Sequence, residues 1–172
     1  RFPEVLSGQI PRLYDIVSYQ LSRAARSGHA LYSAPIGILP HAESIVSSLE
    51  KIYRSKGVLC EFEIDPKSQF SGELGDLQEL LGNFLENAFK WARQRVLLTV
   101  RPLYEPAAKR PGLYLCIEDD GSGIAPEDIS KILQRGVRGY ERVQGHGIGM
   151  AIVQDIIQSY GGELEVDRSD EL

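Results

Sequence analysis

Residues 73–92 read ELGDLQELLGNFLENAFKWA and carry the most apolar helical pattern of the chain. Their apolar positions recur three and four residues apart, which predicts a helix with one buried face. These positions are Leu74, Leu77, Leu80, Leu81, Phe84, Leu85, Ala88 and Phe89. An apolar face this wide needs a large partner surface. We therefore expect the helix to lie against a sheet.

Four polar residues interrupt this pattern at helical spacing: Asn83, Glu86, Asn87 and Lys90. Positions i, i+3, i+4 and i+7 project from one side of a helix, so the four side chains can act together on one ligand. A solvated helix face is the alternative. Asparagine, however, is a poor helix former, and propensity does not explain two of them here. The helix alone leaves both interpretations open.

The segments around this helix predict an α+β domain. The expected elements are a helix from Pro40 to Gly57, strands at 58–64, 95–103, 112–119 and 163–168, a short helix from Pro126, and a helix at 148–159. The link between the second and third strands is too short for a crossover helix, which indicates an antiparallel hairpin. We expect a two-layer α/β sandwich, with a mixed sheet and helices on one face.

The N-terminal part of the chain has a different pattern. Residues 9–26 show apolar residues at helical spacing, but no obvious partner segment follows them. Residues 28–40 mix glycine, proline and serine, which is typical of a linker on the surface. We therefore place a helical segment and linker at 1–39 and the main domain at 40–172.

Composition excludes several classes of protein. The 172 residues are 42% hydrophobic and 25% charged, which is typical of a globular protein and not of collagen, a coiled-coil rod or a disordered chain. The net charge of -5 argues against nucleic acid or an acidic membrane as a partner, so an anionic ligand needs a local site. Cys60 and Cys116 lie in predicted strands and are expected to be buried thiols without a disulfide. With no secretory leader and no apolar run of about 20 residues, we expect a cytoplasmic chain without membrane contact.

Two further motifs contain candidate binding residues. Asp119-Asp120-Gly121-Ser122-Gly123 follows an apolar strand, where a carboxylate can accept hydrogen bonds from a ligand's amine. An acidic turn without a ligand is the alternative. Gly145-His146-Gly147-Ile148-Gly149 opens a helix, and exposed N–H groups at a helix start are receptive to phosphate. This second motif is neither a Walker loop nor a dinucleotide fingerprint.

Three arginines precede the second motif: Arg135, Arg138 and Arg142. Arginines near phosphate-receptive amides can offset the charge of a polyphosphate. Solvated loop arginines are the alternative.

The three motifs in this order and spacing resemble the N, G1 and G2 boxes of the histidine-kinase-type ATP-binding domain. That superfamily also includes type II topoisomerases and HSP90-type chaperones. The resemblance spans about residues 40–168 and is most similar to the sensor histidine kinases. It implies the Bergerat ATP-binding fold, with ATP and Mg²⁺ as cofactors.

The resemblance also implies a role for each matching residue. Asn87, together with Asn83, would lie by the magnesium, and Lys90 would contact a phosphate. Trp91 would take the aromatic position near the adenine, and Asp119 would accept a hydrogen bond from the adenine amine. The remaining cofactor-binding residues that it implies are Gly121, Gly123 and Ile124 near the base, Arg138 and Arg142 in a lid, and Gly145, His146, Gly147, Ile148 and Gly149 where the lid returns to its helix.

The catalytic residues implied by the resemblance are Asn83, Glu86 and Lys90. Hydrolases of the superfamily place a glutamate base four residues before the metal-binding asparagine, and here that position is Asn83. An amide does not abstract a proton from water, so the sequence favours phosphotransfer over hydrolysis. Glu86 could still polarise a nearby group. The lid also departs from the family pattern, because Leu133 stands where a phenylalanine is usual, and a C-terminal strand is expected to be missing.

A histidine kinase of this type needs an acceptor histidine on a dimerising helical hairpin. His29, His41 and His146 lack the sequence context of an acceptor. Residues 9–26 resemble the second arm of such a hairpin. The resemblance therefore implies the cytoplasmic domain of an inner-membrane sensor, with the hairpin, a response regulator and a second copy of the full-length protein as partners. A non-catalytic binding module and a superfamily ATPase are the alternatives.

Overall fold

The computed structural model describes residues 34–123, 127, 147–166 and 172. The chain divides into two units, residues 1–34 and 35–172, and every element below belongs to the second unit. Its main sheet consists of β2 (Leu59–Ile64), β4 (Arg95–Leu103) and β5 (Gly112–Asp119), in the order β2-β4-β5. β2 is parallel to β4, whereas β4 and β5 form an antiparallel hairpin. The predicted mixed sheet and hairpin are thus confirmed.

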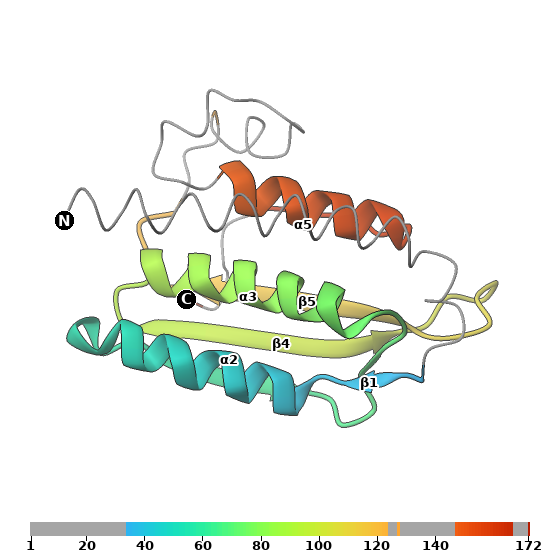
Figure 1. The fold of residues 1–172 in the computed structure, drawn as a ribbon, viewed down its shortest axis with the longest axis horizontal. Coiled ribbons are helices and arrows are strands. Elements are labelled where there is room, and N and C mark those ends of the chain that lie inside the picture. Colours follow the sequence, from blue (N-terminus) through green and yellow to red (C-terminus); the bar gives the residue numbers. More distant parts are fainter. Residues whose placement is uncertain (1–33, 124–126, 128–146, 167–171) are drawn as a thin grey trace. The chain divides into compact units, whose positions relative to one another are not determined.

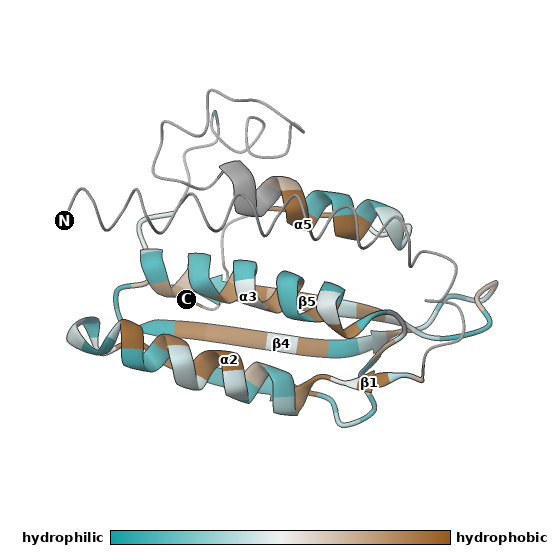
Figure 2. Cartoon of the chain, viewed as in Figure 1, coloured by the Kyte–Doolittle hydropathy of each residue, from teal (hydrophilic) through white to brown (hydrophobic). Residues whose placement is uncertain are grey.

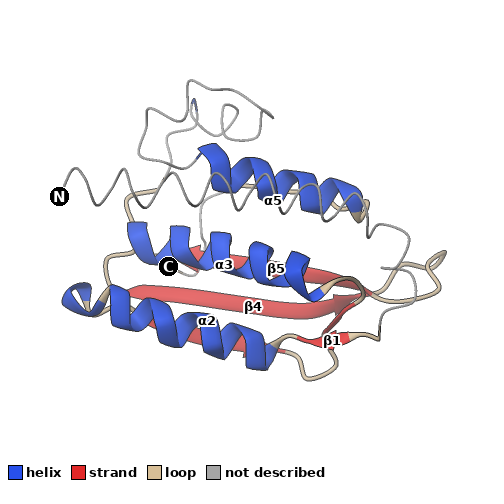
Figure 3. Ribbon diagram, viewed as in Figure 1, coloured by secondary structure: helices blue, strands red, loops and turns tan. Residues whose placement is uncertain are grey.

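Three helices lie on one face of this sheet: α2 (Leu39–Ile52), α3 (Leu74–Trp91) and α5 (Gly147–Ser159), as Figures 1 and 3 show. The short 3₁₀ helix η2 (Arg54–Lys56) follows α2 and ends at Gly57, whose φ of 66° is left-handed. Glycine adopts this conformation without steric cost, so it suits the turn into β2. The predicted two-layer α+β sandwich is confirmed.

The core lies between α3 and β4. Leu77, Leu81, Leu85 and Phe89 of α3 are completely buried, and the sheet supplies a row of buried residues that includes Leu98. Burying each of these large side chains contributes about 1.5–3 kcal/mol to folding. Figure 2 shows hydrophobic colour along most of β4 and hydrophilic bands on the outer surfaces of α2 and α3. The apolar face that the sequence predicts for residues 73–92 is therefore confirmed except at Leu74, which is 41% exposed at the start of α3.

The linker prediction is wrong for residues 36–38. β1 (Ile36–Gly37) pairs antiparallel with β3 (Gln69–Phe70) in a second, two-stranded sheet. Ile38, which follows β1, is only 1% exposed and belongs to the hydrophobic core. Burial of this side chain and pairing of the adjacent backbone hold the segment against the domain, in spite of its loop-like composition.

A hydrogen-bonded cluster joins the end of α5 to the start of α3. The Tyr160 hydroxyl donates to Asp76 Oδ2 at 2.5 Å and accepts the Glu73 N–H at 3.2 Å. Its ring packs on Phe70 with centroids 5.1 Å apart, and a Cβ at Gly72 would lie 2.6 Å from the hydroxyl oxygen. Asp76 is 4% exposed, and desolvation raises its pKa in spite of the hydrogen bond from Tyr160. Burial, followed by the Asp76 contact, raises the pKa of Tyr160 to about 12.

The strand expected at 163–168 does not form at residues 163–166, which follow α5 without strand structure. Their burial still alternates, because Leu164 and Val166 are half-buried while Glu163 and Glu165 are exposed. Alternating burial indicates that the segment favours strand structure, but a strand also needs a neighbouring strand that pairs its N–H and C=O groups. Within the described ranges, no strand pairs with this segment.

Other predicted features have different outcomes. Cys60 and Cys116 form no disulfide, as expected, but both are half-buried where the sequence predicted burial, and burial raises the pKa of Cys60 to about 12. No helix in the described part of the chain is long and apolar enough to cross a membrane. The helix expected at 9–26, most of the helix from Pro126, and Leu133 lie outside the described residues.

Candidate functional site

The polar residues of α3 differ in their exposure. Asn83 is only 8% exposed, and its Nδ2 donates to the Glu79 carbonyl at 2.8 Å and to Glu79 Oε2 at 3.0 Å. Both bonds use the donor group of the amide, so any metal ligation by Asn83 has to use Oδ1. Glu86 and Asn87 are half-buried, and Lys90 is exposed. The four predicted residues thus run from the interior toward solvent along the helix.

The end of α3 carries an aromatic and a cationic side chain together. Trp91 is 40% exposed, and Lys90 Nζ lies 5.7 Å from the centroid of its ring. An ammonium group at this distance is attracted to the face of an indole. The end of α3 therefore presents a flat apolar surface next to a positive charge.

Asp119, the last residue of β5, faces this end of α3. Its Oδ1 accepts the Gly121 N–H at 2.8 Å, which bends the chain directly after the strand. Burial raises the pKa of Asp119, although the Gly121 bond and the charge of Lys56 both act in the opposite direction. A desolvated carboxylate gains more than an exposed one from a hydrogen-bond donor on a ligand.

Gly121 brings α3 and the strand end into close contact. A Cβ at this position would lie 2.4 Å from the Trp91 carbonyl oxygen and 2.6 Å from Asp119 Oδ1. Both distances are shorter than any real Cβ contact, so only glycine fits here. Gly123 follows with a φ of 80°, a left-handed conformation that also favours glycine. The structure thus brings together Trp91, Asp119 and Gly121, three of the predicted site residues.

Asp120 has a different role from its neighbour. Its Oδ1 accepts backbone N–H groups from Arg93 at 2.8 Å, Gln94 at 3.0 Å and Arg95 at 3.1 Å. Slight desolvation alone would raise the pKa of Asp120, but these bonds outweigh it and hold the pKa below its usual value. Asp120 therefore ties the turn after α3 to the end of β5. The sequence places two aspartates here but assigns no such role to Asp120, which directly follows the last residue of β5.

Lys56 is a second residue that the sequence analysis did not single out. Its Nζ donates to the carbonyl oxygens of Phe89 at 2.9 Å and Lys90 at 2.7 Å. The last four carbonyls of a helix lack partners within the helix, so a cation from a neighbouring segment suits this end. The lysine lies directly before Gly57, but its sequence gives no signal for a partner 33 residues away.

The remaining predicted residues belong to the lid and to the start of α5. Gly147, Ile148 and Gly149 form the first turn of α5, which confirms that their motif opens a helix. Six further residues lie outside the described part of the chain: Ile124, Arg135, Arg138, Arg142, Gly145 and His146.

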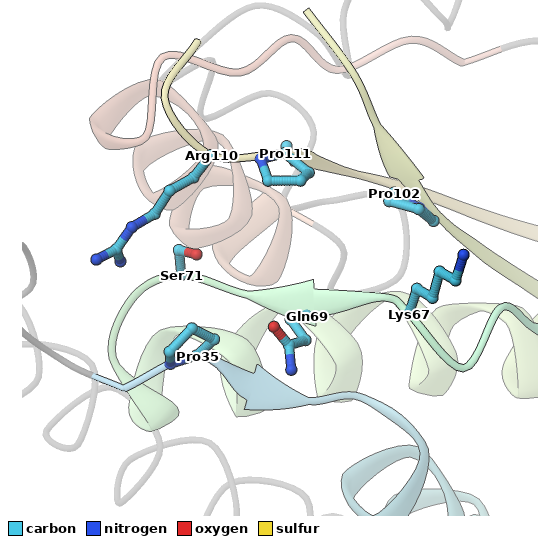
Figure 4. Close-up of a pocket in the computed structure, with 8 residues that line it drawn as sticks. Pro35, Lys67, Gln69, Ser71, Pro102, Arg110 and Pro111 are labelled. Atoms are coloured by element: carbon cyan, nitrogen blue, oxygen red, sulfur yellow. The ribbon is translucent and has the colours of Figure 1, made fainter.

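A pocket of about 240 Å³ lies at the other end of the sheet (Figure 4). Its lining residues are Pro35, Lys67, Gln69, Ser71, Pro102, Arg110, Pro111 and Gly112. β4 begins at Arg95, next to Asp120, and passes Pro102 near its other end. The pocket is therefore separate from the residues around Asp119, and none of its lining residues is a predicted site residue.

The chemistry of the residues around Asp119 fits an adenine nucleotide. The carboxylate provides an acceptor, and the turn at Gly121 has no side chain that would cover the backbone. Trp91 and Lys90 offer an aromatic surface and a cation. Magnesium takes oxygen ligands, which the amides of Asn83 and Asn87 can supply. Among the described residues, no group of three or more His, Cys, Asp or Glu side chains could hold a metal.

Comparisons with known proteins agree with this chemistry. Residues 72–171 match the family described as histidine kinase-, DNA gyrase B- and HSP90-like ATPase. The two-component sensor PhoQ of Pseudomonas aeruginosa is 38% identical over 168 residues, which cover 96% of this chain and 36% of the relative. The sensor protein PhoQ of Escherichia coli K12 is 33% identical, over 96% of this chain and 33% of the relative. The chain thus spans about a third of the length of these relatives.

Solved structures also resemble this fold. The mycobacterial sensor histidine kinase MprB is 26% identical with a TM-score of 0.59, and the match covers 74% of this chain and 80% of that one. ShkA, solved in complex with AMPPNP, is 24% identical with a TM-score of 0.61, over 87% of this chain and 31% of that one. The chain belongs to the histidine kinase-, DNA gyrase B- and HSP90-like ATPase family.

Proposed function

We propose that this domain binds Mg²⁺-ATP and donates its γ-phosphate to a histidine on a dimerisation hairpin. The observation that carries the proposal is the arrangement at the end of β5, where Asp119 is desolvated and Gly121 packs on the Trp91 carbonyl. Asp119 accepts the adenine amine, and Trp91 provides the aromatic surface beside the base. The desolvated carboxylate gains a further hydrogen bond from the amine, beyond the one from Gly121, so a base that lacks the amine binds more weakly.

The polar residues of α3 bind the phosphates and their magnesium ion. Asn87 and Asn83 offer amide oxygens to Mg²⁺, and Lys90 contacts a phosphate oxygen. Glu86 polarises a neighbouring group through a hydrogen bond. Bound ATP supplies the phosphoryl group that is transferred. At Asn83, the Nδ2 bonds to Glu79 orient an amide that cannot remove a proton from water, which favours transfer to a protein side chain over hydrolysis.

The other cofactor-binding residues complete the nucleotide site. Gly121, Gly123 and Ile124 lie near the base, and Arg138 and Arg142 approach the phosphates from the lid. Gly145, His146, Gly147, Ile148 and Gly149 form the return of the lid to α5. These assignments rest on the resemblance of the motifs and, for the last three residues, on their position in the first turn of α5.

The partners and location follow from the same proposal. The acceptor hairpin precedes this domain, and its second arm includes residues 9–26. The full-length protein is a homodimer, it passes the phosphate to a response regulator, and this domain lies on the cytoplasmic side of the inner membrane. The domain boundary lies close to Pro35, because Ile36 and Ile38 pack with the catalytic domain.

Nucleotide binding is the first test. We expect Mg²⁺-ATP at about 100 times its Kd to stabilise the domain by about 2.7 kcal/mol. Asp119→Asn should weaken ATP and ADP strongly and leave a nucleotide without the adenine amine almost unaffected. Glu118→Gln is the matched control, because its side chain leaves β5 on the opposite face. Equal losses for all nucleotides in Asp119→Asn would contradict the adenine role, and no stabilisation of the parent protein would indicate a non-catalytic module.

Phosphotransfer is the second test. Radiolabelled γ-phosphate of ATP is supplied to this chain alone, to the chain mixed with a separate acceptor hairpin, and to a protein that joins the two. We expect no label, slow labelling and rapid labelling respectively, since a joined acceptor has a high effective concentration. The label should be acid-labile. Steady release of phosphate by the chain alone would assign it to the ATPases instead.

A further inference from the structure

The last turn of α3 is held from outside the helix by one side chain. Lys56 Nζ donates to the carbonyl oxygens of Phe89 and Lys90, at 2.9 and 2.7 Å. These carbonyls lie at the negative end of the helix dipole, where a cation is favourable. One ammonium group that binds two adjacent carbonyls holds the last turn of α3 in place, including its final residue, Trp91.

Lys56 itself is held firmly. It ends η2, its N–H donates to the Tyr53 carbonyl at 3.0 Å, and Gly57 closes the turn through the Arg54 carbonyl at 3.1 Å. Its Nζ lies 5.7 Å from the centroid of the Tyr53 ring, and that ring packs at 6.2 Å from Phe89. The ammonium group thus sits between an aromatic ring and the helix end.

The turn that Lys56 fixes forms one wall of the candidate nucleotide site. The Trp91 carbonyl oxygen lies only 2.4 Å from where a Cβ of Gly121 would be, and Gly121 donates to Asp119 Oδ1. A shift of the last turn of α3 would therefore move the turn that orients the Asp119 carboxylate. The contacts run from Lys56 to the Phe89 and Lys90 carbonyls in the last turn of α3, and from the Trp91 carbonyl through Gly121 to Asp119.

We propose that Lys56 is a positioning residue of the nucleotide site, which fixes the end of α3 against Gly121 and thereby the Asp119 carboxylate for adenine recognition. This inference rests on the proposed function. Lys56 contacts neither the base nor the phosphates. It acts through the end of α3 and through its positive charge.

The charges around Asp119 support the electrostatic part of this role. Burial raises the pKa of Asp119, and the nearby charge of Asp120 raises it further, whereas Lys56 lowers it. Three other cationic residues lie at the adjoining ends of α3 and β4, namely Lys90, Arg93 and Arg95, but Lys56 is the cation that acts on the pKa of Asp119. Lys90 Nζ lies over the Trp91 ring, and the Arg95 guanidinium donates to Glu61 at 3.4 Å. Loss of the Lys56 charge should therefore leave Asp119 protonated up to a higher pH.

The test measures ADP affinity without metal between pH 4.5 and 8, together with thermal unfolding. In the parent protein, affinity should fall as the pH falls and Asp119 becomes protonated. In Lys56→Met, the Kd at pH 7 should rise about tenfold, and the midpoint of the pH dependence should move to higher pH. Lys56→Arg, which keeps the charge and the donors, should restore the parent midpoint. Lys109→Met, in the link between β4 and β5, is the control for loss of one positive charge.

The outcomes separate this proposal from the proposed function. Absence of ADP binding by the parent protein would refute the function itself. Normal binding by the parent, with the same Kd and the same midpoint in Lys56→Met, would overturn the role of Lys56. A lower melting temperature with an unchanged midpoint would assign Lys56 a structural role only. If Lys56→Met does not fold, Lys56→Gln keeps a donor without the charge, and its midpoint should still move upward.

Discussion

Replacing Gly121 by alanine tests the closest contact of the candidate site. The new Cβ would lie 2.4 Å from the Trp91 carbonyl oxygen and 2.6 Å from Asp119 Oδ1, well inside the 3.0 Å limit of real Cβ contacts. Neither atom is the end of a long flexible side chain, so the helix end or the Asp119 turn has to move. Forcing a methyl group into a packed site costs about 1–3 kcal/mol.

This cost should appear mainly in ligand binding. If the Asp119 turn moves, the carboxylate no longer meets the adenine amine, and each 1.4 kcal/mol lost weakens binding about tenfold. Calorimetric titration with ADP measures the Kd, and thermal unfolding measures the stability. We expect Gly121→Ala to raise the Kd at least about tenfold and to lower the melting temperature by several degrees.

The chain offers a matched control in Gly82. It lies inside α3, and a Cβ there would have no atom within 4 Å. Alanine is favoured over glycine within a helix by up to about 1 kcal/mol, so Gly82→Ala should stabilise the domain and leave ADP affinity unchanged. The reasoning fails if Gly121→Ala keeps both the parent Kd and the parent melting temperature, or if the two alanine variants behave alike.

Three other substitutions test separate contacts. Asp120→Asn should destabilise the domain by about 1–2 kcal/mol at pH 7, because the amide binds the three backbone N–H groups less strongly. The lowered pKa of Asp120 stabilises the fold above the ordinary carboxyl pKa and this contribution is lost as the pH falls, so urea unfolding of the variant should depend less on pH in acid. Tyr160→Phe should cost about 1–3 kcal/mol by leaving the buried Asp76 without its donor, with unchanged ADP affinity as the control. Asn83→Asp should lose both bonds to Glu79 and place two carboxylates together, so its unfolding free energy should fall at pH 7 and recover as the pH is lowered and one of them is protonated. Equal stability of Asn83→Asp at pH 7 and pH 5 would contradict that contact.

Periodicity predicts the large elements of this fold because long buried faces leave a clear pattern. The apolar positions of α3 and the alternation of β2 both correspond to burial in the structure. β1 and β3 have two residues each, which is too short for any periodicity to show. Their pairing depends on the burial of Ile38 and Phe70, a tertiary effect that the local composition hides.

The residues of the candidate site also divide into those that the sequence predicts and those that it does not. Asp119 and Gly121 could be found from the sequence because a carboxylate and glycines follow a strand there. The role of Asp120 could not be predicted, because its partners are backbone N–H groups of residues 93–95, which any sequence can provide. Lys56 was missed because its partners are backbone carbonyls, which any residue can provide.

The contact between Tyr160 and Asp76 gives α5 a fixed end. The helix starts at the glycine-rich turn and finishes one residue before Tyr160, whose hydroxyl is bound both to Asp76 and to the backbone of Glu73. Ile152, Val153 and Ile156 of α5 are buried as well, so the helix is fixed both by its apolar face and by the hydroxyl bonds at its C-terminal end. The glycine-rich start of α5 is therefore carried by a helix whose direction is set by its own burial and by the Asp76 contact.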